Sequence, residues 1–118
     1  MTVKSYKELI VWQKSMDLVV EVYKLIKTLP KEEDYALSSQ MRRSVISIPS
    51  NIAEGQRRNS KKEFSNYLSI AKGSNAELQT QLLICVRLEY LSKNDIRIAY
   101  NLSLEIDKML YKMISTLK

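Results

Sequence analysis

Glycine and proline, the residues that most often interrupt regular structure, are scarce in this chain. Only two of each occur among its 118 residues. An all-β domain needs turn residues about every 8 to 12 positions, so this scarcity argues against one. The length fits a single domain spanning residues 1–118, and 45% hydrophobic content is ordinary for a folded globular protein. We therefore expect an all-α domain of long helices joined by short loops.

The apolar pattern predicts a first helix from about Tyr6 to Thr28, with two apolar stripes side by side. Ser5 and Glu8 have the spacing of a capping box at its start, and Pro30 ends it. The first stripe consists of Leu9, Trp12, Met16, Val19, Tyr23 and Ile26, and the second of Val11, Leu18, Val22, Leu25 and Leu29.

A second helix is expected to begin near Glu32 or Glu33, because an acidic run suits the positive end of a helix dipole. Its apolar stripe crosses Pro49 without losing phase, which predicts one helix kinked at Pro49. An interior proline costs about 3 kcal/mol unless the helix bends. Gly55 is expected to adopt the left-handed conformation that closes a helix. The stripe consists of Leu37, Met41, Val45, Ile48 and Ile52.

A third helix is expected from Ser60, which has Glu63 as the partner for a second capping box. Inside it, Gly73 forms a patch of small residues with its neighbours, where another backbone can come close. Its apolar face consists of Phe64, Tyr67, Leu68, Ala71, Asn75, Leu78, Leu82 and Cys85.

A fourth helix is expected from Ser92, which has Asp95 as its capping-box partner. The four segments and their short loops predict an antiparallel up-down-up-down four-helix bundle. The apolar seam of the fourth segment consists of Ile96, Ala99, Ser103, Ile106, Leu110, Met113 and Leu117.

Few residue types suited to catalysis are present. The chain has no histidine, a single cysteine and neither a Walker loop nor a GxGxxG motif. We therefore expect no enzyme activity, catalytic residue, metal or cofactor. A carboxylate pair, Glu54 with Glu77, is the alternative, because paired carboxylates can perform acid-base chemistry or bind a metal. The favoured interpretation is a structural polar network of Arg43, Asn51, Glu54, Ser74 and Glu77, with Gln81 as a further partner.

The single cysteine, Cys85, lies in an apolar run and fits a reducing cytoplasm as a buried thiol. The sequence MTVKSYKELI lacks the uninterrupted apolar core of a signal peptide. The most apolar segment is broken by Lys14, Asp17, Glu21 and Lys24, so it does not suit a bilayer. We expect a cytoplasmic protein without a membrane partner.

The chain carries 19 Lys and Arg against 13 Asp and Glu, a net charge of +6. A basic domain suggests a polyanionic partner, most often nucleic acid. No aromatic residue interleaves with the basic cluster, so we expect contacts to backbone phosphate with little sequence readout. The alternatives are a solvated loop without specific function, or binding at Lys14, Lys24 or Lys108. The predicted nucleic-acid contacts are Arg42, Arg57, Arg58, Lys61, Lys62 and Lys72.

The helices carry more apolar surface than one bundle needs, because a bundle helix uses about three positions in seven. Large exposed apolar patches usually mark interfaces, so we expect a homo-oligomer. The alternative is that the wide stripes are buried within the bundle. In a ring, each copy would repeat the basic cluster around a continuous band.

Three blocks, ELIVWQKSMDLVVEVYKLIKTLP, YALSSQMRRSVISIPSNIAEGQRR and EFSNYLSIAKGSNAELQTQL, resemble the four-helix-bundle family of 23S rRNA intervening-sequence proteins. The bacterial accessory variability protein of diversity-generating retroelements belongs to the same group. The resemblance implies a homopentameric ring with a basic surface and, for the retroelement branch, binding to nucleic acid and to a reverse transcriptase. The expected function is nucleic-acid binding without catalysis. The alternative is an adaptor that binds another protein, such as a reverse transcriptase, with no direct role at nucleic acid.

Overall fold

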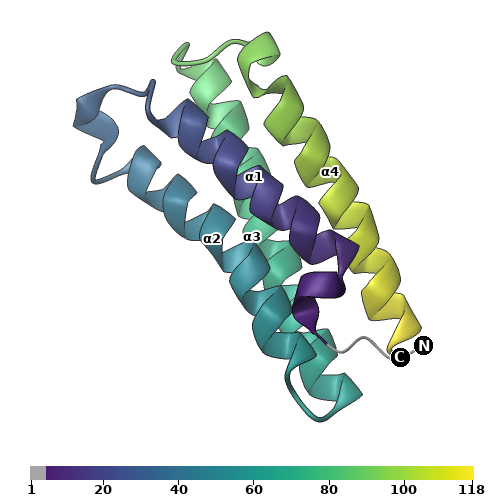
Figure 1. The fold of residues 1–118 in the computed structure, drawn as a ribbon. Helices are drawn as coiled ribbons and strands as arrows, with labels where there is room; N and C mark the ends of the chain where they lie inside the picture. The colour runs from purple at the N-terminus through teal and green to yellow at the C-terminus, as the bar shows by residue number, and fades with distance from the viewer. Residues whose placement is uncertain (1–4) are drawn as a thin grey trace.

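Four antiparallel helices form an elongated bundle in the computed structural model, which describes residues 5–118 (Figure 1). Its principal extents are 45 × 25 × 21 Å. α1 and α3 each pack against both α2 and α4, so the helices occupy the corners of a square in chain order. Residues 5–118 form no strand, which confirms the all-α four-helix bundle. The bounds are α1, Ile10–Ile26; α2, Leu37–Gln56; α3, Lys61–Arg87; and α4, Lys93–Thr116.

The two apolar stripes on α1 are buried to different depths. Val11, Leu18 and Val22 are almost completely buried. The neighbouring stripe is only partly covered, and Met16 on it keeps 42% of its surface exposed. The bundle therefore does not absorb the whole apolar surface of α1, and an apolar strip remains along its outer side.

The starts of the first two helices differ from the predictions. α1 begins at Ile10, and Ser5 instead caps a separate 3-10 turn, Tyr6–Glu8, by accepting a hydrogen bond from the Lys7 amide. The acidic run after Pro30 likewise forms a 3-10 turn, Lys31–Glu33, so α2 begins at Leu37. Both acidic and capping residues stabilise a short turn as readily as a helix, which is why the pattern placed these starts too early.

Glu33 joins this turn to two other elements. One carboxylate oxygen accepts from the Leu37 amide at 3.3 Å, at the start of α2. The other accepts from the Tyr90 hydroxyl at 2.8 Å, beyond the end of α3. This hydrogen bond raises the Tyr90 pKa, because the charged phenolate would face the Glu33 carboxylate. Glu33 thereby fixes the α1–α2 connection against the end of α3.

α2 continues through Pro49 as one helix, as the unbroken apolar stripe predicted. The bend at Pro49 stays a prediction. The role predicted for Gly55 is wrong, because no glycine among residues 5–118 has a positive φ and Gly55 lies inside the helix. A Cβ at Gly55 would lie 2.6 Å from the Cβ of Tyr67. Gly55 therefore allows the backbones of α2 and α3 to approach closely.

α3 and α4 begin where the sequence placed them. The Ser60 hydroxyl accepts from the Glu63 amide at 3.1 Å, and Ser92 and Asp95 form a reciprocal capping box. Gly73 is not the point of close backbone approach that the sequence predicted, because a Cβ added there would meet no atom within 4 Å. Gly73 itself therefore makes no close helix contact within residues 5–118, although its neighbour Ser74 contacts Ser47 on α2.

A buried polar pair connects α3 to α4 in the middle of the core. Asn75 donates to the Ser103 carbonyl at 2.8 Å, and the Ser103 hydroxyl donates to the Asn75 side-chain oxygen at 2.7 Å. Both residues are completely buried. Since each group satisfies the other, the pair fixes the register of the two helices at little desolvation cost.

Candidate nucleic-acid interface

The predicted basic cluster lies at one end of the bundle, where α2 ends and α3 begins. Arg57, Lys61 and Lys62 are exposed there, and none forms an ion pair within the described part of the chain. Their charges face solvent without a compensating carboxylate contact. These three side chains are the available cations of the cluster.

Arg58, by contrast, is held in place by two partners. Its guanidinium forms an ion pair with Glu54 at 2.8 Å and donates to the Tyr67 hydroxyl at 2.7 Å. It also lies 5.0 Å from the centre of the Tyr67 ring, in cation–π geometry. The fold thus places an aromatic residue beside the arginines, which the spacing of the sequence did not indicate. Arg58 is less available to a ligand than the other three cations.

The remaining predicted basic contacts lie away from this end. Lys72 pairs with Asp107 at 3.1 Å, between α3 and α4. Arg42 is half-buried on α2 and has no ion pair within residues 5–118. Neither belongs to the cluster at the α2–α3 loop.

Of the alternative lysines, two are engaged. Lys14 pairs with Glu105 at 2.8 Å, and Lys24 pairs with Glu21 at 3.2 Å. Lys108 is exposed on α4 and forms no ion pair with the described residues. The α2–α3 loop therefore has the densest group of unpaired cations among the predicted sites.

The predicted polar network is divided between two places. Asn51 donates to the backbone carbonyl and hydroxyl of Ser47, and the Ser47 hydroxyl lies 2.8 Å from that of Ser74. Ser47 is the link that the sequence prediction missed. Glu54 takes no part in this series of hydrogen bonds, because it pairs with Arg58.

Arg43 and Glu77 lie beside the hydrogen-bonded side chains of Ser47 and Ser74, and neither forms an ion pair within residues 5–118. They line a shallow polar groove of about 140 Å³ between α2 and α3. Glu77 therefore lies beside Ser47 and Ser74, whereas Glu54 is oriented toward the basic loop. The groove is lined by Gln40, Arg43, Ser44, Ser47, Ser74 and Glu77.

The structure offers little for metal or thiol chemistry. No three His, Cys, Asp or Glu side chains of residues 5–118 gather where they could hold a metal ion. Cys85 is fully buried, with its thiol 3.7 Å from the Met41 sulfur. Burial raises the pKa of this thiol to about 11, which disfavours the nucleophilic thiolate. Cys85 is thus a packing residue of the core.

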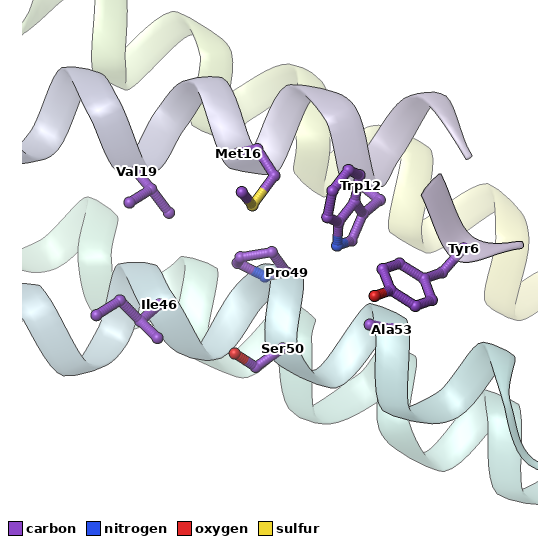
Figure 2. A pocket seen from close by; sticks show the side chains of 8 residues that line it. All are labelled: Tyr6, Trp12, Met16, Val19, Ile46, Pro49, Ser50 and Ala53. Atoms are coloured by element: carbon purple, nitrogen blue, oxygen red, sulfur yellow. The ribbon is translucent and has the colours of Figure 1, made fainter. Parts of the chain in front are cut away.

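An apolar groove, here called the α1/α2 groove, lies on a different side of the bundle. Figure 2 shows Trp12, Met16 and Val19 on α1 facing Pro49 and Ile46 on α2. The groove has a volume of about 340 Å³. Its apolar surface is the outer stripe of α1 that the core covers only in part, extended by the facing side of α2. The lining residues are Tyr6, Trp12, Met16, Val19, Ile46, Pro49, Ser50 and Ala53.

The tip of this groove is built by an aromatic pair. The rings of Tyr6 and Trp12 lie edge to face, with centroids 5.3 Å apart and planes at 65°. A second hollow, lined in part by Val19, Val20 and Tyr23, continues along α1. The exposed apolar surface therefore follows much of the length of α1.

The fold and its surfaces define a small basic four-helix-bundle protein with an uncovered apolar groove. None of the helices in residues 5–118 has the length and apolar character needed to cross a membrane. The sequence model described as 23S rRNA-intervening sequence protein matches residues 7–112, and the chain belongs to this family. The resemblance found in the three sequence blocks is thereby confirmed at the level of the family.

A solved structure supports the same assignment. The chain is similar to a crystallised protein of unknown function from the S23 ribosomal protein family of Bacteroides thetaiotaomicron, at 32% sequence identity. The match has a TM-score of 0.83 and covers 89% of this chain and 98% of that one. No curated protein matches the chain.

Proposed function

We propose that this protein binds RNA or DNA without catalysis, as a homo-oligomer that contacts the nucleic-acid backbone through a basic surface. The observation that carries the proposal is the group of three exposed, unpaired cations Arg57, Lys61 and Lys62 at the α2–α3 loop. The net charge of +6 supports the same partner, since it favours association with a polyanion.

Phosphate is the group that these cations suit best. Lysine and arginine side chains on a short loop can each contact one phosphate, and such contacts position a strand without reading its sequence. Three contacts per chain give weak binding by one subunit. Repetition of the loop around an oligomer supplies many contacts along one strand and raises the overall affinity.

The α1/α2 groove supports the oligomer. A closed ring of identical subunits requires two different surfaces on each copy, one docking into the other. The groove is a candidate for the first surface. Exposed apolar side chains on the opposite helices, such as Ile70 on α3 and Leu104 on α4, are candidates for the second. Five subunits are proposed on the family resemblance.

A charge-matched pair of variants tests the nucleic-acid interface. Combined replacement of Arg57, Lys61 and Lys62 by glutamine should weaken binding to a fluorescent single strand and lower its salt slope by about 2 to 3 for each subunit that contacts the strand. The control replaces Lys31, Lys93 and Arg97 by glutamine, which removes the same charge at the other end of the bundle.

The control variant should bind almost as well as the wild type, because it leaves the α2–α3 loop intact. Equal losses in the two variants would show that only net charge matters. An unaltered affinity in the loop variant would assign binding elsewhere, with Arg42 and Lys108 as the next residues to replace.

Light scattering tests the oligomer separately. Met16→Asp combined with Ile46→Asp places two charges in the α1/α2 groove and should release single chains of 13.7 kDa. Tyr35→Asp is the control, because Tyr35 is 99% exposed on a loop away from the groove. A wild-type mass of one chain at micromolar concentration would refute the oligomer.

The α1/α2 groove also favours a second candidate function, an adaptor that binds another protein such as a reverse transcriptase. An apolar groove suits an amphipathic helix of a partner as well as a second copy of this chain. Under the adaptor hypothesis, neither RNA nor DNA binds even at about 50 mM salt, where phosphate contacts are strong. Retention of nucleic acid at that salt concentration favours the leading proposal.

A further inference from the structure

An apolar pocket opens at the same end of the bundle as the basic cluster. It lies between the start of α3 and the end of α4, with a volume of about 260 Å³. The α1/α2 groove occupies the opposite edge of the square, so this pocket is a separate feature. Its lining residues are Phe64, Lys112, Met113, Thr116 and Leu117.

The aromatic ring of this pocket, Phe64, is held in place by packing against α2. Phe64 packs against the α2 backbone at Gly55, where an added Cβ would come within 3.0 Å of its Cδ1 atom. The half-buried ring is therefore braced on one side and lines the pocket on another. Met113 and Leu117, one turn apart on α4, provide apolar walls.

The lining of the pocket includes one cation, and further lysines lie near it. Lys112 is part of the lining, which contains no acidic residue. Lys61 lies three positions before Phe64, on the same side of α3. Lys108 lies one turn before Lys112 and has no ion pair among the described residues. A ligand that is flat and apolar in one part and anionic in another would satisfy both halves of the site.

We propose that the Phe64 pocket takes one unstacked base of a single-stranded nucleic acid, while Lys61 and Lys112 contact the flanking phosphates. This inference rests on the proposed function and deepens it, because it adds a stacking contact and a preference for single strands. Bases stack on aromatic side chains in a sequence-tolerant way, since every base has a π-face. A duplex keeps its bases stacked and paired, so it cannot fill the pocket without local opening.

Abasic strands separate base binding from phosphate binding. Fluorescence anisotropy should compare a single strand with an abasic strand of equal length and charge, each in DNA and RNA form. The wild-type protein should bind the base-containing strand about five-fold or more tighter, the lower range for one stacked base. A matching duplex should bind no better than the abasic strand.

Single-residue variants then test whether the preference for base-containing strands arises at Phe64. Phe64→Leu should remove the preference for bases while leaving affinity for the abasic strand unchanged. Phe64→Tyr keeps a ring and should keep the preference. Tyr111→Leu removes an exposed aromatic side chain of α4 outside the pocket, so the preference should also survive in this control.

Three outcomes contradict the inference. Equal wild-type affinity for base-containing and abasic strands would show that only phosphates are bound, and the proposed function would stand. A preference that survives Phe64→Leu would place base stacking elsewhere. Absence of binding to every strand would overturn the proposed function, and this inference with it.

Discussion

The two glycines of this chain should respond differently to an added methyl group. At Gly55, a new Cβ would lie 2.6 Å from the Cβ of Tyr67 and 3.3 Å from the carbonyl oxygen of Phe64. Neither atom belongs to a flexible chain end, so α2 and α3 must separate. Overpacking of this kind costs about 1–3 kcal/mol. At Gly73, in contrast, the methyl group would meet no atom within 4 Å.

Both positions lie inside helices, so alanine gains about 1 kcal/mol of helix propensity at each. Gly73→Ala should therefore raise the free energy of unfolding by about 1 kcal/mol. Gly55→Ala should leave the protein less stable than Gly73→Ala by about 1–3 kcal/mol, the cost of overpacking.

Urea denaturation followed by circular dichroism, at one fixed protein concentration, measures both values. Equal shifts in the two variants would refute the close approach of α2 and α3 at Gly55.

Three further predictions concern the core and the caps. Asn75→Ala should lower the free energy of unfolding by about 1–3 kcal/mol in urea denaturation, because Ser103 loses its buried partners. The Cys85 pKa is raised from 9.0 to about 11, so the stability linked to this thiol is full below pH 9 and decreases toward pH 11. Unfolding measured across that range should show a decrease that is smaller in Cys85→Ala, with the remainder assigned to groups such as Tyr90, whose pKa is also raised. Ser92→Ala should cost about 1 kcal/mol through the lost cap, whereas Ser115→Ala should leave the unfolding midpoint almost unchanged.

The sequence predicted the helices best where local chemistry alone decides. Ser60 and Ser92 begin α3 and α4 because a hydroxyl three residues before an acidic residue satisfies amides within the same turn. The start of α2 was missed because the acidic run forms a 3-10 turn, and its hydrogen bond from Tyr90 involves a residue far away in the chain. The role of Gly55 was predicted wrongly because a glycine is needed there for the close approach of α3. The local sequence around Gly55 does not indicate which helix packs against it.

The same distinction applies to the candidate site. The pair of Glu54 with Arg58 has a partner only four residues away, because it joins the last turn of α2 to the loop that follows. The pair of Lys72 with Asp107 cannot be read from local spacing, because its partner lies on another helix. The Phe64 pocket likewise requires α3 and α4 to meet. Sequence identified the basic residues, and the fold decided which of them are unpaired and what lies beside them.

The salt dependence of binding tests the central claim most directly. Anisotropy titrations of a fluorescent single-stranded RNA with the wild-type protein should be repeated between about 50 and 200 mM salt. Binding through backbone phosphates predicts that the logarithm of affinity falls linearly with the logarithm of salt concentration, with a slope of about −0.7 for each phosphate contacted. An affinity independent of salt, or no binding at about 50 mM, would contradict the account.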